Sequence, residues 1–189
     1  LMEDNRGSYI FNSKDLCMIE HIPDLIDANI TSLKIEGRMK GINYLASVVK
    51  TYREAIDAYI QNPDTYQMNP EWLTELYQVF HREYCTGFYF DTPDEQLPNY
   101  KNIHKGKIHS FIGKVIKCST NQNYEVGIRN KISRDDIIEV LSPLSRPKKS
   151  KIVELLDINE ESIESAHPNT LAILKLEVPC QPNDIIRKL

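Results

Sequence analysis

The chain has 189 residues, of which 41% are hydrophobic and 26% charged, a composition typical of a folded globular protein and not of a disordered one. Its formal net charge of -4 excludes an overall basic surface, so any binding of nucleic acid would depend on local basic patches. No apolar run approaches the ~20 residues that cross a bilayer, and the first residues lack the apolar core of a signal peptide. We therefore expect a cytoplasmic protein with no membrane partner.

The N-terminal part predicts two short strands with helical pieces between them. Residues 8–11 are β-prone, and residues 12–15 offer helix-capping side chains, so we expect a strand that passes into a helix beginning near Asp15. Pro23 is tolerated as the first residue of a helix, which favours two short helical pieces over one. Residues 31–35 form the second β-prone run, which ends at Gly37.

Two helices are predicted next. Residues 44–59 place apolar side chains at helical spacing, and this spacing alone explains their tyrosines as core residues. Asn62 and Pro63 end this helix, and Asn69 with Pro70 begins another. The predicted buried side chains are Tyr44, Leu45, Val48, Val49, Tyr52, Ala55, Ile56 and Tyr59 in the first helix, and Trp72, Leu73, Leu76, Tyr77 and Phe80 in the second.

The pattern changes after residues 84–104, which contain two prolines and no clear period and which we interpret as a linker. Short β-prone runs separated by turn-forming clusters follow, at residues 108–118, 124–129, 137–141, 152–156 and 171–178. Such a series favours a small closed barrel or sandwich over a parallel sheet. We expect three regions: 1–60, 61–106 as a helical extension and linker, and 107–189 as a mostly antiparallel β-barrel.

The charged residues between positions 32 and 40 are the strongest candidates for a site. Lys34 and Glu36 would share one face of the predicted strand, Gly37 allows a sharp turn, and Arg38 and Lys40 follow. A solvated charged turn explains the composition alone, whereas the position of Lys34 and Glu36 within an apolar strand favours a site for an anionic ligand.

The four cysteines are too far apart for a zinc knuckle or a redox CxxC pair, and we expect reduced thiols. Cys17 would lie just inside the helix predicted from Asp15, where the helix dipole would stabilise a thiolate suited to metal ligation. His21 could share that helix face, although such a pair is more often a packing coincidence. The common hydrolase and phosphate-loop motifs are missing from the sequence.

Two basic clusters in the C-terminal region are candidates for RNA contact. Arg129, Lys131 and Arg134 form the first cluster, and Lys148 and Lys149 belong to the second. On loops they could bind phosphates without reading sequence. Ordinary solubilising charge is the alternative explanation.

The sequence resembles peptidase family U32, the collagenase-like proteases. The resemblance rests on YIFNSKDLC at residues 9–17, DANITSLKIEGRMK at 27–40, YREAID at 52–57, HREYCTGF at 81–88 and NKISRDDIIE at 130–139, and it covers nearly the whole chain. Within the family the arrangement is most similar to members that make 5-hydroxyuridine at the tRNA wobble position, using prephenate and an iron–sulfur cluster.

This resemblance implies an α+β chain that is the C-terminal part of a larger enzyme. Residues 1–60 would be the closing βα units of a TIM-like catalytic barrel, and the C-terminal barrel would be an accessory domain. Cys17 matches the last cluster cysteine of the family, so its three partners would lie upstream. The iron–sulfur cluster and prephenate would then belong to the full-length protein, and we expect no cofactor in this chain alone.

Three functions follow as hypotheses. In the first, the full-length protein is a tRNA hydroxylase in which Lys34 and Glu36 are catalytic, Arg38 and Lys40 bind the cosubstrate, and the barrel docks tRNA or a homologous partner subunit. In the second, it is a collagenase-like peptidase, although the sequence supplies no recognisable nucleophile and base pair. In the third, residues 107–189 act only as a binding module.

Overall fold

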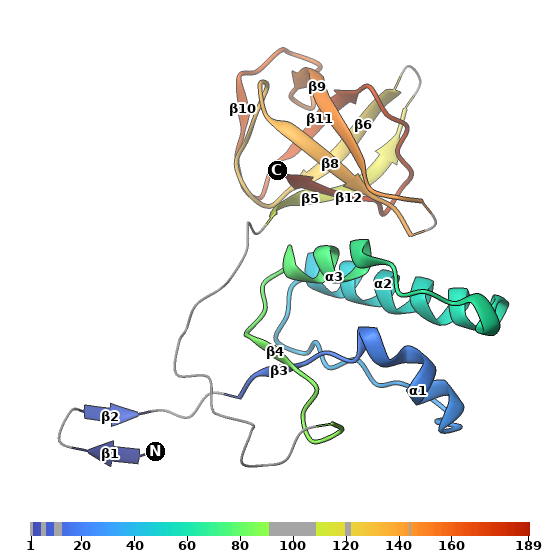
Figure 1. The fold of residues 1–189 in the computed structure, drawn as a ribbon. Helices are drawn as coiled ribbons and strands as arrows, with labels where there is room; N and C mark the ends of the chain where they lie inside the picture. Colours follow the sequence, from blue (N-terminus) through green and yellow to red (C-terminus); the bar gives the residue numbers. More distant parts are fainter. Residues whose placement is uncertain (1, 5–6, 10–12, 91–108, 120–121, 144) are drawn as a thin grey trace. The chain divides into compact units, whose positions relative to one another are not determined.

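The computed structural model describes residues 2–4, 7–9, 13–90, 109–119, 122–143 and 145–189. The chain divides into two compact units, Leu1–Ile108 and His109–Leu189 (Figure 1). The interpretation of residues 84–104 as a linker falls mostly outside the described residues, but Tyr84 and Cys85 form a strand of the first unit. None of the described helices is long and apolar enough to span a membrane.

The first unit contains two small pairs of strands. Strands β1 (Met2–Asp4) and β2 (Gly7–Tyr9) are antiparallel, whereas β3 (Asp15–Leu16) and β4 (Tyr84–Cys85) are parallel. Two backbone hydrogen bonds of 2.9 Å, from Asp15 N to Glu83 O and from Cys17 N to Cys85 O, flank the parallel pair.

The helix predicted to begin near Asp15 is therefore wrong. The backbone of Asp15 and Cys17 pairs with a segment far along the chain, so it does not make the local hydrogen bonds of a helix. The 3-10 helix η1 (Ile19–His21) and helix α1 (Ile22–Asp27) follow instead, with Pro23 in the first turn of α1. The two short helical pieces are confirmed, although the first begins later than predicted and the second begins at Ile22, one residue before Pro23.

The two longer helices are confirmed. Helix α2 (Ile42–Gln61) carries the periodic apolar segment, and helix α3 (Pro70–Tyr77) follows the short 3-10 helix η2 (Pro63–Thr65). Asn69 caps α3 as predicted, because its side-chain oxygen accepts a hydrogen bond of 3.0 Å from Glu71 N. Helices α1 and α3 both pack against α2.

The buried faces of these helices differ in part from the prediction. Val48, Ala55, Trp72 and Leu76 are buried, but the predicted core residues Leu45, Val49, Tyr77 and Phe80 are exposed. Polar Ser47 and Thr51 of α2 are buried instead. The apolar pattern of α2 is wider than the face that α1 and α3 cover, so periodicity alone could not show which part is buried.

The second unit is a closed antiparallel β-barrel, as predicted. Its six strands follow the order β11-β6-β5-β12-β8-β9, and they are β5 (Ser110–Cys118), β6 (Asn123–Ile128), β8 (Ile137–Leu141), β9 (Lys148–Leu156), β11 (Leu171–Leu176) and β12 (Ile185–Lys188). Two short strands, β7 (Ile132–Ser133) and β10 (Ser165–Ala166), pair separately. Strand β12 was not predicted, although it closes the barrel between β5 and β8.

Two features fix the packing of the barrel. Gly113 on β5 lies against β6 so closely that a Cβ atom there would be 2.2 Å from the carbonyl oxygen of Gly127. Arg187 on β12 is fully buried and forms an ion pair with Glu139 on β8, with its Nε 2.7 Å from Glu139 Oε2. The remaining core is mostly aliphatic, with Tyr124 and Cys180 among its buried residues, and it alternates along the strands.

Candidate functional site

A cavity of about 560 Å³ lies within the first unit. Residues 14–18 line one wall, residues 32–40 line another, and Tyr44, Val48 and Tyr52 of α2 contribute a third. Arg82 and Tyr84 also face this space. The cavity is large enough for a small organic ligand, and it contains most of the site residues predicted for the first unit.

The segment that carries Lys34 and Glu36 is not a strand. Residues 32–37 have no regular secondary structure, which corrects the prediction of a strand over residues 31–35. These residues are β-prone, but they pair with no other strand among the described residues. Without the hydrogen bonds between strands, the segment does not form a β-strand.

Lys34, Glu36 and Arg38 lie close together on the exposed rim of the cavity. The side chains of Lys34 and Glu36 are 87% and 73% exposed, and Lys34 Nζ lies 3.8 Å from Glu36 Oε2. Glu36 Oε1 also accepts a hydrogen bond of 3.2 Å from the backbone N–H of Arg38. Glu36 thus holds the turn, and the two cations remain in water, where ion pairs are weak.

Lys40 lies deeper than the other residues of this segment. Its Nζ atom is 3.4 Å from Asp15 Oδ2 and donates a hydrogen bond of 3.1 Å to the carbonyl oxygen of Phe80. The ammonium group also lies over the rings of Tyr44 and Phe80, 4.7 and 5.4 Å from their centroids. Lys40 therefore ties the segment to two other parts of the unit.

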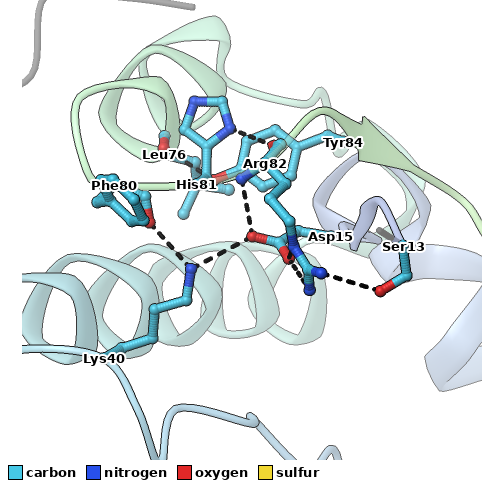
Figure 2. Close-up of polar contacts among 8 residues, drawn as sticks. All are labelled: Ser13, Asp15, Lys40, Leu76, Phe80, His81, Arg82 and Tyr84. Atoms are coloured by element: carbon cyan, nitrogen blue, oxygen red, sulfur yellow. Dashed lines mark hydrogen bonds and ion pairs between the residues drawn. The ribbon is translucent and has the colours of Figure 1, made fainter. Parts of the chain in front are cut away.

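Asp15 and Arg82 form the most extensive polar contact of the cavity, and neither was predicted as a site residue. Figure 2 shows Lys40 and Arg82 reaching the Asp15 carboxylate from two sides. Arg82 donates to Asp15 Oδ1 through Nε at 2.8 Å and lies 2.7 Å away through Nη2, while its backbone N–H donates to Oδ2 at 3.0 Å. Its Nη1 atom donates to Ser13 Oγ at 3.0 Å.

The contacts of Asp15 explain its charge. Burial acts to raise the pKa of the carboxyl group, but the hydrogen bonds from Arg82 and the positive charge of Lys40 outweigh it, so the pKa lies below its ordinary value. The carboxylate is ionised at neutral pH. One negative charge is thus shared between two cations.

The chain around Arg82 is held by aromatic and backbone contacts, as Figure 2 also shows. His81 stacks on Tyr84 with ring centroids 4.2 Å apart, and its Nδ1 atom donates to the carbonyl oxygen of Arg82. Tyr84 donates a hydrogen bond of 2.8 Å to Leu76 O. These contacts fix the backbone that presents the guanidinium group.

Cys17 lines the cavity next to Tyr52. The Tyr52 hydroxyl donates towards Cys17 Sγ at 3.8 Å and accepts a hydrogen bond of 2.8 Å from Met18 N. Burial raises the pKa of the Cys17 thiol. This contradicts the prediction of a thiolate stabilised by a helix dipole, because no helix begins at Asp15. His21 pairs with Asp24 at 3.1 Å.

The residues present fit an iron–sulfur cluster only in part. Cys17 lines the cavity and could supply one ligand through its sulfur. In the described ranges, however, no three side chains of His, Cys, Asp or Glu converge on a point where a metal could bind. The other ligands of a cluster are thus not supplied by this part of the chain. All four cysteines are free thiols, as predicted.

The balance of charge around the cavity is positive. Among the described residues that line it, the cations are Lys14, Lys34, Arg38, Lys40 and Arg82, and the carboxylates are Asp15 and Glu36. The chain as a whole has a net charge of -4. The cavity is therefore positively charged although the chain as a whole is negatively charged, and a positively charged site attracts an anionic ligand.

The two basic clusters of the barrel lie on different elements. Arg129 and Lys131 are exposed on the connection from β6 to β7. Arg134, half-buried, contacts Ser162 and lies 3.7 Å from Glu164. The prediction that Lys148 and Lys149 lie on a loop is wrong, because they begin β9 and pair with Val140 and Glu139 of β8.

Comparison with known families agrees with this arrangement. The model of peptidase family U32 matches residues 1–99, and the model of the peptidase family U32 C-terminal domain matches residues 107–187. The cavity lies in the first match and the barrel in the second.

Three curated relatives show the range of names in the family. The chain is 33% identical to tRNA hydroxylation protein P1 of Bacillus subtilis over 100% of its own length and 45% of the relative. It is 42% identical to tRNA hydroxylation protein P2 of the same organism, over 48% of the chain and 30% of the relative. It is 31% identical to a collagenase of Porphyromonas gingivalis, over 60% of the chain and 32% of the relative.

The chain thus spans less than half the length of these relatives. The two family matches together include the cavity, the Asp15–Arg82 pair and the barrel. The chain belongs to peptidase family U32 and carries the C-terminal domain of that family.

Proposed function

We propose that the chain is the C-terminal portion of an enzyme that hydroxylates the wobble uridine of tRNA in a prephenate-dependent reaction. The observation that carries this proposal is the cavity in which five cations face two carboxylates within an otherwise acidic chain. Prephenate is a dicarboxylate, and a cationic cavity of this size suits it. The names of the relatives, tRNA hydroxylation proteins P1 and P2, support the same assignment.

Four side chains of residues 32–40 have separate roles in this proposal. Arg38 and Lys40 bind the anionic cosubstrate, Arg38 from the exposed rim and Lys40 from the interior. Lys34 and Glu36 act at the reacting group, because their side chains lie 3.8 Å apart on the rim and place an acid and a base next to each other. The hydrogen bond from Arg38 N to Glu36 supports this placement.

The full-length protein would hold an iron–sulfur cluster with Cys17 as one ligand. The exposure of Cys17 to the cavity supports this role, and its partners would come from outside the described residues. The cluster supplies one-electron redox chemistry when it is bound. Tyr52, whose hydroxyl contacts Cys17 Sγ, would orient the sulfur.

Residues 1–60 would close a TIM-like catalytic barrel in the full-length protein, and residues 61–106 would extend it. The parallel pairing of β3 with β4 supports a parallel sheet that joins both regions, because β3 lies in residues 1–60 and β4 in residues 61–106. In a TIM barrel the ligand lies at the C-terminal ends of the strands. Cys17 directly follows β3 and lines the cavity, which agrees with that rule.

The C-terminal barrel would be an accessory domain that contacts RNA or a homologous partner subunit. Its exposed cations Arg129, Lys131, Lys148 and Lys149, with the half-buried Arg134, would contact tRNA phosphates in the cytoplasm. The existence of relatives named P1 and P2 in one organism supports a homologous partner.

Cells that lack the full-length gene test the proposal. Their tRNA should contain no 5-hydroxyuridine at the positions this enzyme serves, and the intact gene should restore the modification, as measured by mass spectrometry of nucleosides. The same gene in cells blocked in prephenate synthesis should restore none. Full restoration in those cells would contradict the role of prephenate. Unchanged 5-hydroxyuridine in the deletion strain would contradict the role in tRNA hydroxylation.

A collagenase-like peptidase is the second candidate, because a relative is named collagenase. No histidine is among the described residues that line the cavity, so neither Cys17 nor Ser32 has a histidine base there. Purified full-length protein tests this function on gelatin. Cleavage that is lost on mutation of a cavity residue would favour the peptidase over the hydroxylase.

A further inference from the structure

Arg82 is a cation of the cavity to which no function has been given so far. It lies between α3 and β4, outside the segment of residues 32–40. We propose that Arg82 contacts the carboxylate of the ligand in the cavity, and that Asp15 is the positioning residue that holds the guanidinium group there. This inference rests on the proposed function, because it assumes that the cavity binds a small carboxylate.

The first step of the argument is the placement of Asp15. Its side chain is only 11% exposed, and both of its oxygens are used: Oδ1 by the Arg82 side chain, Oδ2 by the Arg82 backbone and by Lys40. A carboxylate that receives this many charge-assisted contacts has one orientation. The guanidinium group that it binds is therefore also fixed.

The second step is the charge that remains. Asp15 carries one negative charge, and Arg82 and Lys40 carry two positive charges on either side of it (Figure 2). The three side chains all line the cavity. The group thus presents a net positive charge to the cavity, and an incoming carboxylate would balance it.

The third step is the accessibility and shape of the donor. The Arg82 side chain is 35% exposed, compared with 22% for Lys40, so Arg82 is the more accessible of the two cations that contact Asp15. The side chains of the rim are much more exposed, as Lys34 at 87% shows. A partly buried guanidinium group binds a carboxylate more strongly than a fully hydrated cation. Nη1 and Nη2 of Arg82 each carry two N–H groups, so one contact with Ser13 or Asp15 does not use all the donors of either atom.

The chain contains a matched comparison. Arg53 and Asp57 on α2 also form an arginine–aspartate pair, but their side chains are 57% and 50% exposed, and neither residue lines the cavity. Mutation of Arg53 removes the same chemical group from the protein without changing the cavity. It is the control for any loss of positive charge.

The experiment measures ligand binding to the full-length protein by calorimetry, with prephenate and with malonate as probes. Arg82→Ala should raise the Kd for prephenate by at least about tenfold, the factor that one charge-assisted hydrogen bond is worth. Arg82→Lys should restore part of the affinity, and Arg53→Ala should leave the Kd unchanged. Circular dichroism identifies variants that do not fold, and Arg82→Gln replaces Arg82→Ala in that case.

The sign of the effect at Asp15 separates positioning from simple neutralisation. Asp15→Asn removes a negative charge close to the anion, so electrostatics alone predicts tighter binding. Loss of the anchor for Arg82 predicts weaker binding, and we expect a rise in Kd of several-fold. Tighter binding by Asp15→Asn would overturn the positioning role.

The two probes separate this inference from the proposed function. A folded Arg82 variant that binds prephenate with the wild-type Kd overturns the inference and leaves the proposed function intact. Arg82-dependent binding of malonate without binding of prephenate supports the inference and contradicts the proposed cosubstrate. A wild-type protein that binds neither probe overturns both.

Discussion

The hydroxyl group of Tyr52 joins two neighbouring residues of the cavity wall, since it accepts a hydrogen bond of 2.8 Å from Met18 N and lies 3.8 Å from Cys17 Sγ. Tyr52 belongs to α2, 35 positions away from Cys17. Burial raises the pKa of Tyr52 well above its ordinary value, so the hydroxyl keeps its proton. One side chain of α2 therefore fixes the segment that follows β3.

Removal of this hydroxyl should destabilise the protein. Tyr52→Phe leaves the N–H of the buried residue Met18 without its partner, which costs about 1–3 kcal/mol of unfolding free energy. Urea denaturation measures the change. The control is Tyr66→Phe, because the Tyr66 hydroxyl is buried and has no hydrogen-bond partner among the described residues. Equal stability losses in both variants would contradict the assigned role of Tyr52.

The close approach of β5 and β6 gives a second prediction. Gly113→Ala would place a Cβ atom 2.2 Å from the backbone oxygen of Gly127, and backbone atoms can move only if the strand pair separates. We expect a loss of about 3 kcal/mol or more. Gly41→Ala is the control, because a Cβ at Gly41 meets no atom within 4 Å; its expected cost is below about 1 kcal/mol. A Gly113→Ala protein with wild-type stability would show that the two strands do not approach this closely.

The buried pair Glu139–Arg187 gives a third prediction. Glu139→Gln removes the carboxylate charge that pairs with the fully buried Arg187, which costs about 3–5 kcal/mol of unfolding free energy. The double variant Glu139→Leu with Arg187→Leu removes both charges and should be less destabilised than the single one. Thermal unfolding compares the two. If the double variant is the less stable of the two, the buried charge is not the cause of the loss.

Cys180 should make the stability of the protein depend on pH. Burial raises the pKa of this thiol to about 12 from its ordinary value of 9.0. The folded state thus keeps a proton that the unfolded state loses, so the contribution is complete below about pH 9 and is lost as the pH rises towards 12. The urea concentration at the midpoint of unfolding should decrease as the pH rises across this range. In Cys180→Ala the decrease should be smaller. An identical slope in the variant would mean that other groups cause it.

Alkylation tests the same burial directly. At pH 8 Cys180 should react with iodoacetamide at least about a hundredfold more slowly in the native protein than in urea, because only the thiolate reacts. Peptide mass spectrometry follows the modification of this one residue.

Much of the fold could be predicted from the sequence because its signals are local. Helix α2 follows from apolar spacing, and the start of α3 follows from Asn69 and Pro70. Strand β8 has its predicted bounds, Ile137–Leu141. These elements depend on neighbouring residues only, which a linear pattern contains.

The arrangement of the site could not be predicted, because its contacts are distant in the sequence. Asp15 and Arg82 are 67 positions apart, and no spacing rule connects them. Because Asp15 and Leu16 pair with a distant strand, they form β3 and not the predicted helix. Cys17 therefore does not lie at the helix N-terminus that the prediction required. Residues 32–40 were identified as a site by their charges, and the cavity does include them, but their strand was wrong because no partner strand pairs with it in the part of the chain that is described.

The most direct test of the central claim is the 5-hydroxyuridine content of tRNA in cells that lack the gene and carry variants of the full-length protein. Arg38→Ala and Lys40→Ala should restore less than about a tenth of the wild-type content, whereas Arg53→Ala, outside the cavity, should restore all of it. Western blots confirm equal protein levels. Restoration to the wild-type level by both cavity variants would contradict the claim that this cavity serves tRNA hydroxylation.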